Sequence, residues 1–203
     1  MPNVEKITKQ TENPFVNLYL VEGTNKVNHH FRYYVASRAK SIEQMKIKTR
    51  KNNSRTGVLM YSLYGEKRTT KLSMVRQYRV SIDDYIYEFP AGLVEPGEEF
   101  HEAAVREMHE ETGLTFHPLK VDPCYEKPFF TTIGLTDEAC SAVYGWCEGE
   151  ISRKYLEESE VIEVVLADRE EAKRILKEEN VAIMCSYHLM HFIHDEEPFA
   201  FLK

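Results

Sequence analysis

The order of strand-like and helix-like segments constrains the fold of this chain most strongly. Aromatic and β-branched residues predict strands before and after one helix over about residues 98–112, and two further helices close the chain. The expected strands cover residues 15–21, 31–37, 57–64, 71–78, 85–89, 121–130, 139–148 and 162–167, and the closing helices cover about 168–179 and 181–194. Strict alternation of strand and helix, which marks a doubly wound sheet, is missing. The sequence therefore predicts an α+β fold or a three-layer α/β/α sandwich.

The N-terminal part of the chain has a pattern of its own. Turn residues 22–25 separate the first two expected strands, which predicts a β-hairpin. Residues 40–56 are polar and basic, and we expect a connection with one helical turn there. The length of 203 residues suits one domain with a small appendage. We therefore expect a hairpin subdomain and linker over residues 1–56 and the main domain over residues 57–203.

Charge and composition restrict the partners and the compartment. The chain has 33 acidic and 26 basic residues, a net charge of −7, whereas non-specific binding to nucleic acid requires a basic face. No apolar run approaches the roughly 20 residues of a membrane span, and the N-terminus lacks the apolar core of a signal peptide. The four cysteines form no paired metal spacing. We expect a cytoplasmic protein with reduced thiols that binds neither nucleic acid nor membrane.

The central helix carries an unusual cluster of acidic residues. Glu107, Glu110 and Glu111 lie at positions i, i+3 and i+4, so their carboxylates crowd one helix face and repel one another. Two of them lie in the last turn, where the helix dipole also disfavours negative charge. Arg106 lies four residues after Glu102, the favourable order for an offsetting ion pair. The cluster is either a solvated acidic face or a site for a cation such as Mg²⁺, which prefers hard oxygen ligands.

The residues around this helix favour the cation site. The segment from Gly92 to Leu114 reads GLVEPGEEFHEAAVREMHEETGL and resembles the Nudix box, G-x5-E-x7-R-E-U-x-E-E-x-G-U with U apolar. The matching positions are Gly92, Glu98, Arg106, Glu107, Met108, Glu110, Glu111, Gly113 and Leu114. The resemblance implies the Nudix α/β/α sandwich and a Mg²⁺-dependent pyrophosphohydrolase, with Mn²⁺ as a possible substitute.

The family pattern also implies roles within the box. Glu107 and Glu111 would hold the metal ions together with the backbone carbonyl of Ala91, and Glu110 would contribute through a water or a second metal. Arg106 belongs to the expected catalytic set and would form a structural ion pair with Glu98 that orients the preceding loop.

Further segments resemble the ADP-ribose pyrophosphatase branch of the Nudix family. They are Arg76–Arg79, Tyr87–Gly92, Gly134–Glu138, Glu158–Ile162 and Asp168–Ala172. By resemblance, Glu158 would be the general base with Glu160 as the second candidate, and the alternative for both is a solvated acidic loop.

The branch also implies a set of substrate contacts. Arg79 would contact phosphate or ribose, Glu138 the terminal ribose, Tyr33 the base by stacking, and Arg38 would add a basic contact. Against these roles stand a cross-strand core aromatic for Tyr33 and a surface ion pair for Arg79. The N-terminal hairpin resembles the family's small sheet, which implies a homodimer in which that sheet helps clamp the substrate.

One departure from the branch leaves the sugar open. The branch has Ser-Pro-Gly before the ribose-contacting loop, whereas this chain has Thr132, Ile133 and Gly134. The resemblance therefore implies hydrolysis of a nucleoside diphosphate sugar, first of all ADP-ribose to AMP and ribose 5-phosphate, with GDP-mannose as a second candidate. Two alternatives are a non-catalytic Nudix ligand sensor, against which the complete box argues, and a hydrolase of oxidised nucleoside triphosphates, against which the N-terminal hairpin argues.

Overall fold

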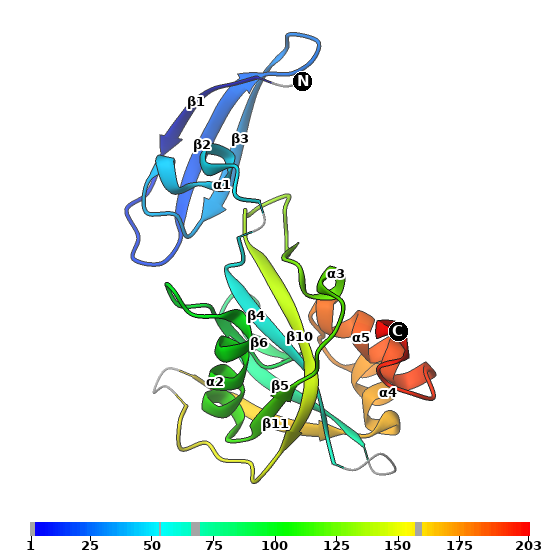
Figure 1. Cartoon of the computed structure of the whole chain (residues 1–203). Helices are drawn as coiled ribbons and strands as arrows, with labels where there is room; N and C mark the ends of the chain where they lie inside the picture. The colour runs from blue at the N-terminus through cyan, green and yellow to red at the C-terminus, as the bar shows by residue number, and fades with distance from the viewer. Residues whose placement is uncertain (1–2, 53, 66–69, 157–159) are drawn as a thin grey trace. The chain divides into compact units, whose positions relative to one another are not determined.

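The computed structural model describes residues 3–52, 54–65, 70–156 and 160–203. The chain divides into two compact units, both visible in Figure 1. The first unit contains residues 1–56 and 128–140, and the second contains residues 57–127 and 141–203. Residues 128–140, which the sequence pattern assigns to the main domain, therefore cluster with the N-terminal residues.

A three-stranded antiparallel sheet forms most of the first unit. Its strand order is β1-β2-β3, with β1 at Asn3–Lys9, β2 at Asn17–Thr24 and β3 at His30–Ser37. The expected hairpin is β2 and β3. The sequence does not predict β1, because its polar residues carry little strand signal and its pairing is irregular near Val4. Tyr19 on the central strand is fully buried.

Short elements complete the first unit. The connection after β3 contains single turns, η1 at Ile42–Gln44 and α1 at Lys46–Thr49, as the sequence indicates. The strand β9, Phe129–Phe130, pairs with Ala139 and Cys140 at the start of β10.

A larger sheet forms the centre of the second unit. Its main path runs β11-β5-β4-β10-β8, while β6 pairs with β5 and β7 pairs with β4. The bounds are β4 Gly57–Tyr64, β5 Lys71–Arg79, β6 Asp84–Glu88, β7 Ala91–Leu93, β8 Thr115–Pro118, β10 Ala139–Glu148 and β11 Ile162–Ala167. The strands expected between residues 57 and 89 and between 139 and 167 therefore exist, and the very short β7 and β8 are additions.

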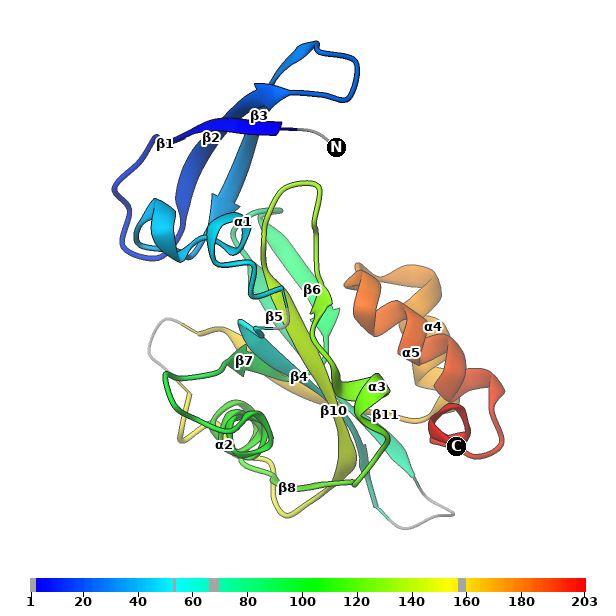
Figure 2. The same cartoon turned by 45° about the horizontal axis from the view of Figure 1, so that its top comes forward.

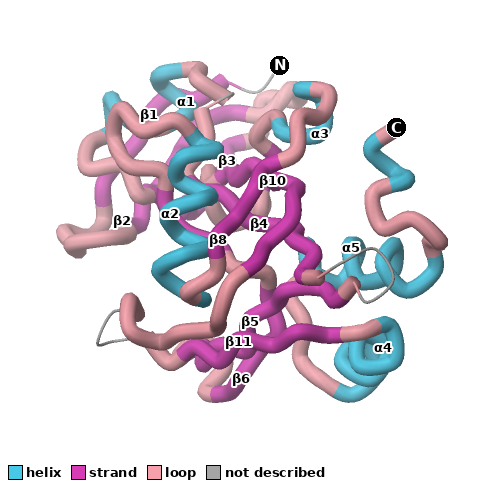
Figure 3. Tube along the Cα trace, turned by 60° about the horizontal axis from the view of Figure 1, so that its bottom comes forward, coloured by secondary structure: helices cyan, strands magenta, loops and turns pink. Residues whose placement is uncertain are grey.

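Helices cover both faces of this sheet and confirm the expected sandwich. Figures 1 and 2 show α2 (Phe100–Thr112) on one face and α4 (Arg169–Glu178) with α5 (Ile183–His194) on the other. Side chains of β4 alternate between the two sides: Met60 packs in the core under α2, and Tyr61 packs with Leu189 of α5. The tube in Figure 3 shows the same separation of the helices by the strands. Two hydrophobic cores therefore hold three layers together.

One expected strand was wrong in part. Residues 121–130 contain the helical turn α3, Pro123–Glu126, and within this segment only Phe129 and Phe130 form a strand. The carboxylate of Asp122 accepts a hydrogen bond from the amide of Cys124 over 2.8 Å, and Pro123 occupies the first helical position. An Asp cap followed by proline favours a helical start over a strand.

The remaining segment is the single turn η2 at Ala200–Leu202. Among the residues that the structure describes, no helix has the length and apolar character needed to cross a bilayer.

Candidate functional site

Capping interactions fix the register of the acidic helix α2. The carboxylate of Glu99 accepts a hydrogen bond from the amide of His101 over 2.8 Å at its start. Gly113 ends the helix with a φ of 77°, in the left-handed region that favours glycine. Because both ends are set, Glu107 and Glu111 lie one turn apart at a defined place beside the sheet.

Glu111 is a buried carboxylate. It shares a helix face with Ala104 and Met108, both fully buried, and is itself only 6% exposed. The amide of Ala91 donates a hydrogen bond to its Oε2 over 3.0 Å. Burial raises the pKa of Glu111 to about 8, and the nearby charge of Glu107 adds to the increase, while the bond from Ala91 opposes it. The interactions that the chain makes with Glu111 therefore do not offset the cost of burying its ionised carboxylate.

Glu107 lies against the loop before the helix. A Cβ placed on Gly92 would lie 1.9 Å from Cδ of Glu107, so only glycine fits at that position. Burial raises the pKa of Glu107, although hydrogen bonding to Arg106 opposes the rise. The box glycine thus has a steric role that its sequence position alone does not reveal.

Arg106 ties the helix to the preceding loop. Its Nε and Nη2 donate hydrogen bonds to the two oxygens of Glu98, each over 2.9 Å, and Nη2 also donates to the carbonyl of Leu93 over 3.0 Å. Hydrogen bonding to Arg106 lowers the pKa of Glu98 to about 2. The expected ion pair with Glu98 is thus confirmed. The expected pair with Glu102 is not formed in the described structure, because the two-pronged geometry with Glu98 satisfies the guanidinium better than a single i,i+4 contact.

Arg106 also offsets the repulsion within the acidic cluster. Its Nη1 donates hydrogen bonds to Oε1 of Glu107 and Oε2 of Glu110, both over 2.9 Å. The Glu110 side chain is 46% exposed, far more than that of Glu107. Of the three clustered carboxylates, that of Glu110 is therefore the most exposed to solvent.

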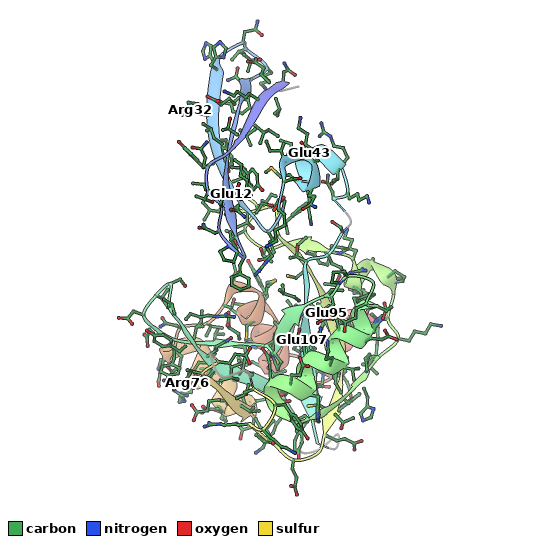
Figure 4. The ribbon with its side chains drawn as sticks, turned by 90° about the vertical axis from the view of Figure 1, so that its left-hand side faces the viewer. Glu12, Arg32, Glu43, Arg76, Glu95 and Glu107 are labelled. Atoms are coloured by element: carbon green, nitrogen blue, oxygen red, sulfur yellow. The ribbon has the colours of Figure 1, made fainter. Side chains whose placement is uncertain are left out.

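A cavity of about 590 Å³ adjoins these carboxylates. Glu160 and Tyr155 lie on its wall, and the ring of Tyr155 packs on His109 of α2 with centroids 4.5 Å apart. Figure 4 shows Glu107 on α2 and Glu95, another lining residue, on the loop before it. The full lining is Ala91, Gly92, Leu93, Val94, Glu95, Pro96, Arg106, Glu107, Glu110, Glu111, Tyr155 and Glu160. All four expected metal-site residues thus border one cavity.

The structure describes one of the two candidate general bases. Glu160 lines the cavity, and its charge raises the pKa values of both Glu107 and Glu111. Glu158 lies outside the described residues. Sequence reasoning misses Tyr155, because an isolated tyrosine in a polar loop carries no sequence signal.

Arg79 has a partner that the sequence did not reveal. Oε2 of Glu88 accepts a hydrogen bond from Nε of Arg79 over 2.8 Å and forms an ion pair with Nη2 over 2.6 Å. The positive charge of Arg79 lowers the pKa of Glu111, which places the guanidinium in the electrostatic surroundings of the acidic site. Glu88 belongs to the Tyr87–Gly92 segment, and its position directly before Phe-Pro-Ala-Gly was the signal available.

The donor set is suited to a hard divalent cation. In the described part of the chain, no three His, Cys, Asp or Glu side chains are already grouped as metal ligands, and Arg106 bridges Glu107 and Glu110. Even so, the charge of Glu160 raises the pKa of both Glu107 and Glu111, and the charge of Glu107 raises the pKa of Glu111 further. A bound cation would relieve that repulsion, and carboxylate oxygens are the ligands that Mg²⁺ and Mn²⁺ accept.

The remaining candidate residues belong to the first unit. The Tyr33 hydroxyl donates a hydrogen bond to the carbonyl of Gly134, and the ring is 45% exposed, so Tyr33 is not a core aromatic. Nε of Arg38 donates to Oε1 of Glu138 over 3.3 Å. Arg38 and Glu138 line a separate cavity of about 450 Å³, together with Lys46, which the sequence did not single out.

Several curated relatives of this chain are pyrophosphatases by name. It is 34% identical over 115 residues to ADP-ribose pyrophosphatase of Bacillus subtilis (strain 168), a match that covers 55% of this chain and 58% of that protein. It is 29% identical over 108 residues to ADP-ribose pyrophosphatase of Saccharomyces cerevisiae, covering 53% and 47%. A match to ADP-sugar pyrophosphatase of Mus musculus has 37% identity over 81 residues, covering 37% and 35%. The matched segments span about half the length of the first of these relatives, and less in others.

The fold and the family follow from two further comparisons. A crystal structure of ADP compounds hydrolase superposes with a TM-score of 0.65 and 18% identity, covering 87% of this chain and 83% of that one, which establishes a shared fold. A family model described as NUDIX domain matches residues 53–185, well over half of the chain and the whole of the box. This chain belongs to the Nudix family.

Proposed function

We propose that this protein hydrolyses the pyrophosphate bridge of a nucleoside diphosphate sugar with the help of Mg²⁺. The observation that carries the proposal is the buried carboxylate of Glu111, which lines one cavity together with Glu107 and Glu160. ADP-ribose is the first substrate, because relatives in two organisms are named ADP-ribose pyrophosphatase. Its hydrolysis would release AMP and ribose 5-phosphate.

The residues of the cavity have distinct roles in this proposal. Glu107, Glu111 and the carbonyl of Ala91 would hold Mg²⁺, or Mn²⁺ in its place, and Glu110 would assist through a water or a second ion. The bound cation supplies charge neutralisation at the pyrophosphate and polarises the phosphorus. Arg79 would bind a phosphate oxygen through its guanidinium.

A carboxylate at the cavity would activate the attacking water. Glu158 is the first candidate for the group that accepts the proton, and Glu160 is the second, which its place in the lining of the cavity supports. Water would attack one phosphorus of the bridge, the bond from that phosphorus to the bridging oxygen would break, and the two monophosphates would leave. Arg106 would act by holding Glu98 and the loop carbonyl of Leu93 in place rather than by touching the substrate.

The first unit would select the substrate. Glu138 would contact the terminal ribose, Tyr33 would stack on the base, and Arg38 would add a basic contact. The loop at Ile133 closes without the branch's proline: the Thr132 carbonyl accepts hydrogen bonds from the amides of Leu135 and Thr136 over 2.8 and 2.9 Å. The turn thus forms without the proline, and GDP-mannose is the second substrate to test.

We also propose a homodimer assembled through the first unit. The strand β3 lies at an edge of its sheet, and edge strands present unpaired backbone groups to a partner. Phe15, Val16 and Tyr34 in this unit expose large apolar side chains. Sedimentation equilibrium should give twice the chain mass; a monomer at micromolar concentration would rule this assembly out.

The test of the activity is a panel of ADP-ribose, GDP-mannose, ADP-glucose, NADH and an oxidised dGTP with Mg²⁺ and, separately, Mn²⁺. We expect AMP release from ADP-ribose to exceed turnover of the others. A preference for another sugar would keep the chemistry and change the substrate. No turnover with either metal, together with tight binding of a nucleotide, would replace the proposal with a ligand sensor.

Two matched variants test which glutamate is the general base. Glu158→Gln should lower kcat with Mn²⁺ affinity nearly unchanged, and Glu160→Gln is the parallel variant. If Glu158→Gln leaves kcat unchanged and Glu160→Gln lowers it, the base is Glu160.

A further inference from the structure

The ion pair between Glu88 and Arg79 has an asymmetric geometry. One carboxylate oxygen, Oε2 of Glu88, accepts a hydrogen bond from Nε of Arg79 over 2.8 Å and lies 2.6 Å from Nη2 in an ion pair. The Glu88 side chain is 20% exposed and that of Arg79 is 47% exposed. The carboxylate is thus held within the protein surface while the guanidinium reaches toward solvent.

This geometry fixes one edge of the guanidinium and leaves the other edge available. The Nε–Nη2 edge faces Glu88, whereas Nη1 of Arg79 has no hydrogen-bond partner among the described residues. Arginine donates through a planar fork, so fixing one edge also sets the plane and direction of the other. An arginine without such a partner loses more side-chain entropy when it binds an anion.

The position of Arg79 makes its direction important. Its partner Glu88 lies three residues before Ala91, which lines the acidic cavity, so the ion pair ties Arg79 to the segment that enters the site. Glu88 offers Arg79 a carboxylate at hydrogen-bond distance and so restricts the directions in which the guanidinium can point.

We propose that Glu88 is a positioning residue, which holds Arg79 so that its Nη1 edge meets an anionic phosphate group of the substrate. This inference rests on the proposed pyrophosphate hydrolysis. It adds that Glu88, which touches neither metal nor substrate, sets substrate affinity through Arg79 alone.

A double-mutant cycle tests the dependence on Arg79. The variants are Glu88→Gln, Arg79→Ala and the double variant, and each is checked for folding by thermal denaturation. Dissociation constants for ADP-ribose are measured by calorimetry with Ca²⁺ in place of Mg²⁺ to slow turnover, and KM and kcat are measured with Mg²⁺. The matched control is Glu163→Gln, which removes the partner of Arg76, three residues before Arg79 on the same strand (Figure 4 labels Arg76).

We expect Glu88→Gln to weaken ADP-ribose binding and raise KM about tenfold, the effect of losing one charge-assisted interaction, with a smaller change in kcat. In the Arg79→Ala background the same substitution should have no further effect. The control should match the wild type. In an ¹⁵N NMR spectrum, the Nε–H signal of Arg79 should shift in Glu88→Gln and stay unchanged in the control.

Two results would overturn the inference in distinguishable ways. If the wild type hydrolyses ADP-ribose but the effects of Glu88→Gln and Arg79→Ala simply add, Glu88 acts independently of Arg79 and only the positioning role is lost. If the wild type neither binds nor hydrolyses ADP-ribose or the other nucleotide sugars, the proposed function fails and the positioning role fails with it.

Discussion

The backbone amide of Ala91 donates a hydrogen bond to Oε2 of Glu111, with 3.0 Å between the two atoms. It joins the loop at β7 to the last turn of α2 and is the main interaction of the chain that favours the ionised form of Glu111. One backbone donor does not offset the cost of burying a carboxylate beside another carboxylate. Ionisation of Glu111 therefore destabilises the metal-free protein at the place where the proposed chemistry needs a cation.

The substitution Glu111→Gln should stabilise the metal-free protein and abolish turnover. Glutamine keeps an oxygen for the amide of Ala91 and removes the buried charge, so we expect a gain of about 1–3 kcal/mol at pH 8. Urea denaturation in EDTA measures the gain. The control is Glu102→Gln on the exposed side of the same helix, which should change neither stability nor rate. Near-normal turnover in Glu111→Gln would exclude this residue as a metal ligand.

The stability of the metal-free protein should depend on pH through the same residue. The pKa of Glu111 is about 8 in the folded protein, against a reference value of 4.5, so the folded state binds more protons than the unfolded state between these values. Stability from this group is complete below about pH 4.5 and is lost as pH rises toward 8. Denaturation midpoints from pH 5 to 8.5 should fall less in Glu111→Gln than in the wild type; parallel profiles would contradict the assignment.

The substitution Gly92→Ala should disrupt the site without unfolding the domain. Its Cβ would overlap the carboxylate of Glu107 and force that side chain out of its position. We expect Mn²⁺ affinity, measured by electron paramagnetic resonance, to fall at least about tenfold. This is the size of effect expected when a residue that positions a metal-ligating side chain is changed. Gly134→Ala is the control, because a Cβ there meets no atom within 4 Å. Wild-type metal affinity in Gly92→Ala would show that Glu107 is not a ligand.

The substitution Arg106→Lys should loosen the loop before α2. Lysine keeps the charge but cannot reproduce the two parallel hydrogen bonds to Glu98 together with the bond to Leu93. We expect a loss of about 1–2 kcal/mol of unfolding free energy and a reduced kcat. The exposed Arg153, which forms only a 3.8 Å ion pair with Glu163, provides the control Arg153→Lys. Equal stability of both variants would contradict a structural role for Arg106.

Two buried tyrosines should respond in opposite ways to the loss of their hydroxyls. The hydroxyl of Tyr61 is buried without a hydrogen-bond partner in the described structure, whereas that of Tyr19 donates to the carbonyl of Ala39 over 2.6 Å. Tyr61→Phe should raise the unfolding free energy by about 1 kcal/mol, and Tyr19→Phe should lower it by a similar amount. Thermal denaturation of the pair checks the difference; destabilisation by Tyr61→Phe would reveal a partner for its hydroxyl.

The sequence by itself determined the features that depend on local spacing. The i, i+3 and i+4 positions of Glu107, Glu110 and Glu111, the capping Gly113 and the β2–β3 hairpin follow from periodicity and turn residues, which act over a few residues. The box predicted the family for the same reason, since all its residues lie within one loop and one helix.

Only the tertiary structure decided which carboxylate is buried and which residues meet across elements. Glu111 is buried because its helix face packs on the sheet, Glu107 lies against Gly92, and Glu88 meets Arg79 from the neighbouring strand. The desolvation of a side chain and its contacts with distant residues depend on how helices and strands pack, so residues adjacent in the sequence do not encode them directly. The misassigned segment 121–130 shows the converse, because a local cap at Asp122 prevailed over an apolar pattern that suggested a strand.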